Sequence, residues 1–239
     1  MKDSVLVAGA SGDTGGEILG YLDGTGATVT ALTRSAENSE ELLSAGADSV
    51  VVGDLFDPRD AESAVEGIDV VLSAVGSRPR DILTEGEFVD GVGNINLARA
   101  AEQEGVNHIV MESAIGVGDE PTGLFGASLD AFLRPIQEAK SDAEREVRSS
   151  DIDHTILRPG ALTSVRFSPS PQVAEAGSKL WGGISRKTVA ELMAASPYTP
   201  EAKDCTLEAV ENALLCGKDT GIDWQYPKSQ EGTKIPIES

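Results

Sequence analysis

The sequence predicts an α/β protein whose parallel sheet is doubly wound, with helices on both faces. Short apolar runs rich in β-branched residues alternate with amphipathic stretches over residues 1–158, which is the pattern of consecutive βα units. Runs such as Val70-Val71-Leu72 are apolar without interruption, as expected of strands covered by helices on both faces. A glycine-rich turn directly follows the first apolar run. Together these three observations define the fold class.

The strands and helices follow one another in a regular order. Strands are predicted at Ser4–Ala8, Thr28–Thr33, Ser49–Val52, Val70–Ala74, His108–Glu112 and His154–Arg158. Helices are predicted between them at Thr14–Gly24, Ser39–Ala45, Pro58–Val65, Phe88–Glu104 and Pro135–Ser149. Asp57 offers an N-cap before a proline in the first helical position. A later helix is expected from Thr188 to Ala195, and the tail 223–239 is expected to be irregular.

The composition is strongly acidic. The 239 residues include 40 Asp and Glu against 19 Lys and Arg, for a net charge of -21. Such a surface repels phosphate backbones, so nucleic acid is not expected as a partner. The acidity, together with few lysines and 4% aromatic residues, favours adaptation to high salt over an ordinary acidic cytosolic protein.

The sequence also gives expectations for the location of the protein and for metal binding. The chain has no apolar stretch approaching the ~20 residues that cross a membrane. Its first residues run directly into a strand pattern without a signal peptide, so we expect a cytoplasmic protein. Cys205 and Cys216 have no histidine nearby, which is not a metal-ligand spacing, so no metal is expected.

The glycine-rich segment Gly9-Ala10-Ser11-Gly12-Asp13-Thr14-Gly15 joins the first strand to the first helix. Gly9 permits the tight turn, Gly12 lets the backbone approach a pyrophosphate, and Gly15 lets helix and strand pack closely. The N-terminus of the helix then donates backbone N–H groups to the anion. A purely structural turn is the alternative, but the order strand, turn, helix favours a dinucleotide on a Rossmann-type fold.

The end of the second strand indicates which dinucleotide is bound. NAD sites usually carry Asp or Glu there, where the carboxylate accepts hydrogen bonds from the ribose. This chain has Arg34 followed by Ser35. A guanidinium is a planar donor suited to a phosphate, and a hydroxyl adds a further donor. The sequence therefore predicts NADP(H) over NAD(H), with a solvated surface arginine as the alternative.

The ends of the third and fourth strands face the same crevice, because ligands bind at the carboxyl ends of parallel strands. Asp54 is expected to accept from the adenine amino group, or alternatively to cap the helix at Pro58, while Leu55 packs on the ring. The segment Ala74-Val75-Gly76 ends the fourth strand, and Gly76 lets the backbone pass close to the adenosine ribose. Residues 1–158 are thus predicted as the NAD(P)-binding Rossmann core. Residues 159–239 are predicted as a small C-terminal substrate-side region packed on it, in one structural domain.

These residues resemble the short-chain dehydrogenase/reductase superfamily, in its atypical branch of NAD(P)H-binding proteins. The resemblance covers most of the chain. It is carried by the glycine spacing of residues 9–15, by Gly53-Asp54-Leu55, by Asn94-Ile95-Asn96-Leu97, by Arg158-Pro159-Gly160 and by Ile184-Ser185-Arg186-Lys187-Thr188-Val189-Ala190. It implies that Pro159 lies at the cofactor.

The resemblance also implies a catalytic serine, tyrosine and lysine, with the tyrosine four positions before the lysine. Ser113 matches the serine at the end of the fifth strand. Lys140 matches the lysine, which in the family binds the nicotinamide ribose. The position of the tyrosine is occupied by Ile136, which exchanges no proton. The acid of the family is therefore missing.

Other proton donors are less well placed. The three tyrosines, Tyr21, Tyr198 and Tyr226, lie outside the predicted helix Pro135–Ser149 that carries Lys140. Nothing in the sequence places Tyr198 at the site. Asp130 and Glu138 fit a solvated acidic face. The histidines, His108 and His154, stand at strand starts and are interpreted as structural.

Three functions stay open at this point. The first is an NADPH-dependent reductase of a small acceptor, such as a flavin or quinone, that needs no dedicated tyrosine acid. The second is a non-catalytic NADP(H) sensor or scaffold, which the loss of the tyrosine favours. The third is a nucleotide-sugar epimerase or dehydratase, against which Ile136 argues. A small-molecule substrate is expected, and a homo-oligomer is compatible with the sequence.

Overall fold

The structure is a computed structural model that describes residues 3–77, 86–118, 127–168, 170–178, 180–215 and 218–227, the side chains of 127–132 and 215 excepted. Its centre is an eight-stranded sheet in the order β3-β2-β1-β4-β5-β6-β10-β8. In chain order these strands are β1 (Ser4–Ala8), β2 (Thr28–Thr33), β3 (Ser49–Val52), β4 (Val70–Ser73), β5 (His108–Glu112), β6 (Asp153–Pro159), β8 (Gln172–Glu175) and β10 (Cys205–Val210). All neighbours pair in parallel except β8 with β10.

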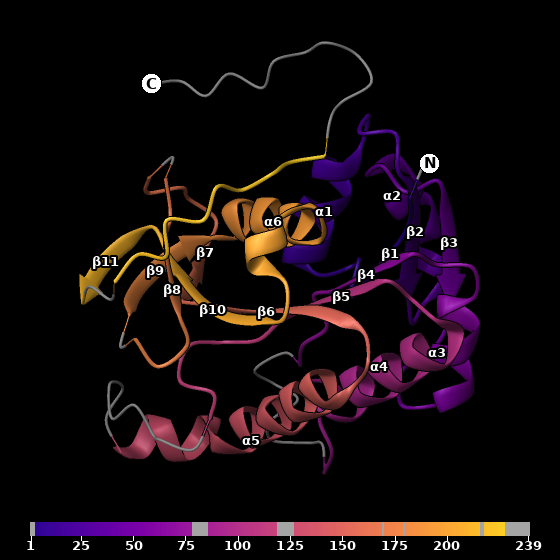
Figure 1. Ribbon diagram of the computed structural model, residues 1–239. Coiled ribbons are helices and arrows are strands. Elements are labelled where there is room, and N and C mark those ends of the chain that lie inside the picture. The colour runs from indigo at the N-terminus through magenta and orange to yellow at the C-terminus, as the bar shows by residue number, and fades with distance from the viewer. Residues whose placement is uncertain are drawn as a thin grey trace.

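Helices cover both faces of this sheet. In Figure 1, α1 and α6 lie above the sheet, whereas α3, α4 and α5 lie below it. The helices are α1 (Asp13–Leu22), α2 (Ser39–Ser44), α3 (Pro58–Val65), α4 (Val92–Glu104), α5 (Ala127–Ser149) and α6 (Arg186–Ala195). Short 3-10 turns lie at Ala36–Asn38, Ser196–Tyr198 and Pro200–Ala202. None of the helices in the described part of the chain is long and apolar enough to cross a membrane.

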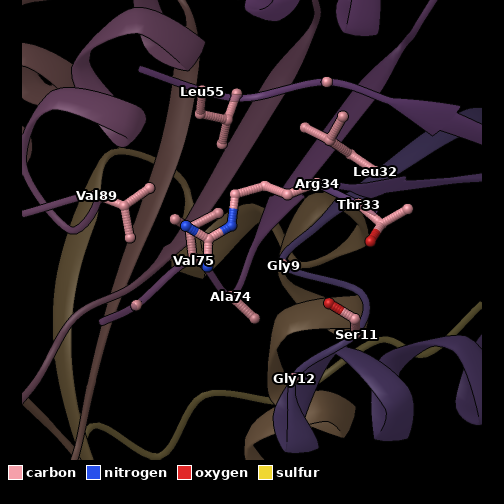
Figure 2. A pocket seen from close by; sticks show the side chains of 12 residues that line it. Gly9, Ser11, Gly12, Leu32, Thr33, Arg34, Leu55, Ala74, Val75 and Val89 are labelled. Carbon is pink, nitrogen blue, oxygen red and sulfur yellow. The ribbon is translucent and has the colours of Figure 1, made fainter. Parts of the chain in front are cut away.

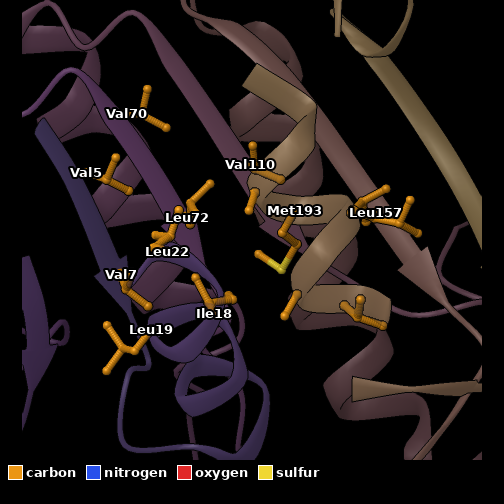
Figure 3. Packing of buried hydrophobic residues seen from close by; sticks show 14 of the residues in the cluster. Val5, Val7, Ile18, Leu19, Leu22, Val70, Leu72, Val110, Leu157 and Met193 are labelled. Carbon is orange, nitrogen blue, oxygen red and sulfur yellow. The ribbon is translucent and has the colours of Figure 1, made fainter. Parts of the chain in front are cut away.

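The core forms two layers because consecutive strand residues point to opposite faces. Val5 and Val7 of β1 belong to the layer under α1 and α6, where Met193 of α6 also packs (Figure 3). Leu6 and Ala8 of the same strand belong to the opposite layer under α3, α4 and α5. All of these side chains are 2% exposed or less. This two-sided burial explains why the strands read as uninterrupted apolar runs.

The doubly wound parallel sheet is confirmed, with small differences in the bounds. Four of the six predicted strands have the predicted limits, the fourth ends one residue earlier, and the sixth is one residue longer at each end. The fourth helix was predicted from Phe88 but begins at Val92, because residues 88–91 form a turn that positions Asp90. The fifth helix was predicted from Pro135 but begins at Ala127 and carries the proline inside it. Proline there removes a backbone donor without ending the helix.

The region after residue 158 contributes to the central sheet. Strand β10 pairs in parallel with β6, and β8 adds an antiparallel edge. A second sheet of three strands contains β7 (Ala161–Thr163), β9 (Trp181–Ser185) and β11 (Asn212–Leu215). The described part of the tail, up to residue 227, is irregular, and Ile222 and Trp224 pack against the core.

A buried histidine at the amino edge of the sheet is expected to make the free energy of unfolding decrease at acidic pH. His108 is buried at the start of β5, where its Nε2 lies 3.0 Å from the Thr155 hydroxyl. Burial lowers the pKa of His108 to about 4. Between about pH 6.5 and pH 4, His108 therefore binds a proton in the unfolded chain but not in the folded chain. The free energy of unfolding decreases as the pH falls through this range. We expect the contribution lost by pH 5 to be about 2 kcal/mol.

Chemical denaturation of the wild type and His108→Gln at pH 7 and pH 5 measures this loss. The variant is expected to lose about 2 kcal/mol less free energy of unfolding between the two pH values. Equal losses in both proteins would show that His108 does not contribute.

Candidate functional site

A pocket lies at the carboxyl edge of the sheet, where the strand order reverses between β1 and β4. In doubly wound sheets this switch point is where ligands bind. Figure 2 shows side chains from several loops turned into the pocket. Its lining is Gly9, Ser11, Gly12, Leu32, Thr33, Arg34, Gly53, Leu55, Ala74, Val75, Gly76 and Val89.

The glycine-rich turn leaves no room for side chains. Gly9 has a φ of +76°, and a Cβ on it would lie 2.5 Å from the carbonyl oxygen of Ala74. A Cβ on Gly15 would lie 2.2 Å from the carbonyl oxygen of Gly9. Gly12 donates its N–H to that same oxygen at 2.9 Å. The turn is therefore compact enough to place the start of α1 directly beside the end of β1.

The N-terminus of α1 is open to an anion. Gly12 is the N-cap residue, and no side chain caps the helix. The N–H groups of the first turn are consequently left for a ligand. Asp13 in this turn would oppose an anion, but its carboxylate lies 3.4 Å from Nε of Arg186 in α6. The arginine offsets that charge, so the turn fits a pyrophosphate.

Arg34 follows β2 and extends across the pocket in Figure 2. It is exposed, and no described residue forms a salt bridge with it. The Ser35 hydroxyl accepts a hydrogen bond from the N–H of Glu37 at 3.3 Å. Its proton is left to donate to a ligand. In a chain with a net charge of -21, an unpaired guanidinium on a pocket stands out.

The ends of β3 and β4 form the rest of the pocket. Leu55 is buried against it, while Asp54 is exposed and accepts from the N–H of Phe56 at 3.1 Å. The helix cap weighed for Asp54 belongs instead to Asp57, whose Oδ1 accepts from the N–H of Arg59.

Lys140 lies on α5 and is held by a buried acid. Its Nζ is 3.0 Å from Oδ1 of Asp90, a residue that is 1% exposed. The other oxygen of Asp90 accepts from the N–H of Ser77, just after β4, at 2.6 Å. Burial opposes ionisation of Asp90, but Lys140 and Ser77 outweigh it and lower the pKa of the carboxyl. Lys140 is therefore held beside the end of β4 by this contact.

Ser113 is engaged with a second buried acid. Its hydroxyl donates to Oε1 of Glu144 at 2.6 Å. Glu144 also accepts from Arg158 at 2.9 and 2.6 Å and from Arg148 at 2.9 Å. Burial opposes ionisation of Glu144, but these partners lower its pKa. The proton of Ser113 is thus committed to Glu144, which leaves the serine oxygen as an acceptor.

The structure brings a third buried acid to this edge, and the sequence reasoning missed it. Glu112 ends β5 and is 8% exposed. Oε1 of Glu112 accepts from the Thr14 hydroxyl at 3.4 Å. Burial raises the pKa of Glu112, and the opposing effects of Lys140, Thr14 and Arg186 do not cancel it. The signal available in the sequence was an ionisable residue directly before Ser113.

The tyrosines lie away from this edge. The Tyr198 hydroxyl donates to Oδ2 of Asp3, which precedes β1 at the opposite edge of the sheet. Burial and this hydrogen bond raise the pKa of Tyr198. Tyr21 and Tyr226 pair with ring centroids 6.4 Å apart, at the far end of α1 from the glycine turn. Ile136 is half-buried on α5.

The two histidines and Glu138 also offer no proton donor at the pocket, which none of them lines. Both histidines are buried at the amino edge, where Nδ1 of His154 lies 3.4 Å from Asp204. Glu138 is exposed, and the side chain of Asp130 falls outside the described residues.

Half of the predicted cofactor residues line the pocket. Those that line it are Gly9, Ser11, Gly12, Arg34, Leu55, Ala74, Val75 and Gly76. Those that do not line it are Ala10, Asp13, Thr14, Gly15, Ser35, Asp54, Lys140 and Pro159. Leu32, Thr33 and Gly53 adjoin predicted residues along the chain, whereas Val89 comes from the turn before α4 and had no sequence signal.

The chain is similar to known proteins. A model of an NAD(P)H-binding family matches residues 9–200. An uncharacterized chloroplastic protein of Arabidopsis thaliana is 31% identical over 223 residues, which are 87% of this chain and 77% of that protein. Sanguinarine reductase of Eschscholzia californica is 29% identical over 202 residues, which are 67% of this chain and 70% of the reductase.

A solved structure described as an NAD-dependent epimerase/dehydratase from Bacillus halodurans matches with a TM-score of 0.75. It is 27% identical in sequence, and the match covers 88% of this chain and 94% of that one.

Two neighbouring glycines give a test of the turn. In Gly15→Ala the added methyl group collides with the Gly9 carbonyl, so we expect a lower melting temperature and at least tenfold weaker NADPH binding. In Gly16→Ala the new Cβ meets nothing within 4 Å. Because alanine favours a helix over glycine by about 1 kcal/mol, this control is expected to melt no lower and to bind normally. Thermal melts with and without NADPH measure both effects. Equal behaviour of the two variants would contradict the packing role of Gly15.

Proposed function

The chain belongs to the NAD(P)H-binding family within the atypical short-chain dehydrogenases/reductases, and on that premise we propose that it is an NADPH-dependent reductase of a small acceptor, such as a flavin or quinone. The observation that carries the proposal is the pairing of an uncapped α1 N-terminus with an unpaired Arg34 on one pocket. The first suits a pyrophosphate and the second an additional phosphate. The similarity to a reductase over 202 residues supports the direction of the reaction.

The residues divide the task of holding the cofactor. The first turn of α1 offers backbone N–H groups to the pyrophosphate, while Arg34 and Ser35 offer donors to a 2′-phosphate. Leu55 and Val89 supply apolar surface for the adenine. Lys140, held by Asp90, offers its ammonium group to hydroxyls of the second ribose. When bound, NADPH supplies a hydride to the acceptor.

The acceptor follows from what the site lacks at the tyrosine position. Reduction of a simple ketone needs a proton donor within hydrogen-bond reach of the developing alkoxide. At that position stands Ile136, and the Tyr198 hydroxyl is held at the other edge of the sheet. Flavins and quinones delocalise the incoming charge, so their reduction depends less on a tyrosine. We therefore propose this class of acceptor ahead of ketones.

A second candidate function is a non-catalytic NADP(H) sensor. The observation that favours it is the engagement of Ser113 with Glu144, which removes the serine proton from use. In this case the dinucleotide would bind without being consumed.

Cofactor choice is tested by replacing Arg34. We expect Arg34→Ala to weaken NADPH binding by about tenfold to a hundredfold, since a charge-assisted hydrogen bond contributes about 1.5–3 kcal/mol, and to change NADH binding little. Arg59→Ala removes an equally cationic side chain that pairs with Asp57 outside the pocket, and it is the matched control. Fluorescence titrations with both cofactors measure the effect. Equal weakening of NADPH and NADH would contradict the phosphate role of Arg34.

Activity is tested with purified protein and a panel of acceptors. Oxidation of NADPH is followed at the nicotinamide absorbance band with flavins, quinones and ketones, at low and high salt. We expect turnover with a flavin or quinone that exceeds turnover with ketones. Tight NADPH binding without turnover on any acceptor would instead favour the sensor.

A further inference from the structure

We infer that Glu112 is the proton donor of this site, in the place left empty by the missing tyrosine. The inference deepens the proposed reductase function and rests on it. It assigns the acid to the carboxyl end of β5, on the face of the sheet opposite to α5.

The topology places Glu112 under the second half of the dinucleotide. The pocket with Arg34 is formed by the ends of β1, β2, β3 and β4, so it spans the switch point and stops short of β5. A dinucleotide binds across the crevice at that point, with its pyrophosphate at the N-terminus of the first helix. Its nicotinamide half therefore extends over the ends of β4 and β5. Glu112 is the last residue of β5.

The direction of the side chain agrees with this placement. In β5, Val110 packs in the layer under α1 and α6, and Met111 packs in the opposite layer. By the alternation of strand residues, Glu112 faces α1 and α6 while Ser113 faces α5. The Thr14 contact confirms that the carboxyl lies against the first turn of α1, which is where the pyrophosphate binds.

The carboxyl group is buried but weakly satisfied. Thr14 at 3.4 Å is its one hydrogen-bond partner among the described residues, and no described cation forms an ion pair with it. In contrast, Glu144 accepts four hydrogen bonds from side chains. A buried carboxyl without a strong partner favours its neutral form, which carries a proton.

The surrounding charges tune this group without pairing with it. Lys140 from α5 and Arg186 from α6 act to lower the pKa of Glu112, and Asp90 acts to raise it, in addition to burial. Lys140 is itself paired with Asp90, and Arg186 lies beside Asp13 of α1. Both cations are therefore partly neutralised by other acids, and the net effect leaves the pKa of Glu112 raised.

The proposed step balances without a further reagent. The acceptor takes a hydride from NADPH and a proton from the carboxyl of Glu112, giving the two-electron-reduced acceptor, NADP+ and the Glu112 carboxylate. The Glu112 carboxylate would be stabilised by the positive charge of an oxidised nicotinamide bound beside it. Glu112 then regains a proton from water after the products leave.

Proton linkage tests this assignment without turnover. The nicotinamide ring is cationic in NADP+ and neutral in NADPH, so NADP+ is expected to drive Glu112 towards its carboxylate form. Calorimetric titrations in buffers of different ionisation enthalpy count the protons exchanged. We expect NADP+ binding to release up to about one proton per site more than NADPH binding. The 2′-phosphate is common to both cofactors, so its own titration cancels in this difference.

The variant Glu112→Gln keeps the shape of the side chain and removes the titration. In this variant we expect NADP+ and NADPH binding to release the same number of protons. Its NADPH affinity is expected to stay within about threefold of the wild type. Glu175→Gln, at the exposed end of β8, is the control and is expected to keep the difference. A difference that persists in Glu112→Gln, or is absent from the wild type, overturns the assignment.

Measurement of kcat then shows whether Glu112 donates the proton during turnover. With the acceptor that the wild type reduces, kcat of Glu112→Gln is expected to fall by about 10²-fold, and the decrease of the wild-type rate at high pH is expected to vanish. An unchanged kcat overturns the donor role. If no acceptor is reduced but the proton difference is present and lost in the variant, the reductase proposal fails while the proton-holding role of Glu112 stands.

Discussion

The contact between Gly15 and the carbonyl of Gly9 is the constraint on which the site depends. A Cβ on Gly15 would lie 2.2 Å from the carbonyl oxygen of Gly9, so only glycine allows α1 to start immediately beside β1. This places the uncapped first turn at the switch point of the sheet, between the ends of β1 and β4. Without this close approach, the N–H groups of α1 would point away from the pocket that Arg34 lines.

The scarcity of positive charge makes the distribution of the cations informative. Several of the cations near the carboxyl edge are paired with acids: Lys140 with Asp90, Arg158 with Glu144 and Arg186 with Asp13. These pairs fix the geometry of the edge, because two of the acids are nearly inaccessible. Arg34 differs in having no salt-bridge partner among the described residues. An arginine that the protein does not neutralise itself is suited to an anion from outside.

Local patterns predicted the part of the structure that local forces determine. The strands β1 to β6 and the glycine turn could be placed because burial on both faces and backbone space leave a direct record in residue type. The pairing of β10 with β6 could not be predicted, since it joins residues about fifty positions apart with no marking in either segment. The start of α5 was missed because proline favours the first turn of a helix, whereas Pro135 lies inside α5.

The same limit applies to the chemistry of the site. The family resemblance predicted roles for Ser113 and Lys140, but their partners are Glu144 and Asp90, which no local pattern connects to them.

The alternation of β5 decides from which side of the sheet a proton can come. Ser113 faces α5, where two arginines keep Glu144 ionised and the serine proton is bound to that acid. Its neighbour Glu112 faces α1, where burial raises the pKa of a carboxyl that has one weak hydrogen-bond partner among the described residues. Neighbouring positions at the end of the strand therefore face two acids whose pKa values are shifted in opposite directions, Glu144 downwards and Glu112 upwards. In the proposed reaction, a site with Ile136 at the tyrosine position on α5 takes its proton from the opposite side of the sheet, at the strand residue that precedes Ser113.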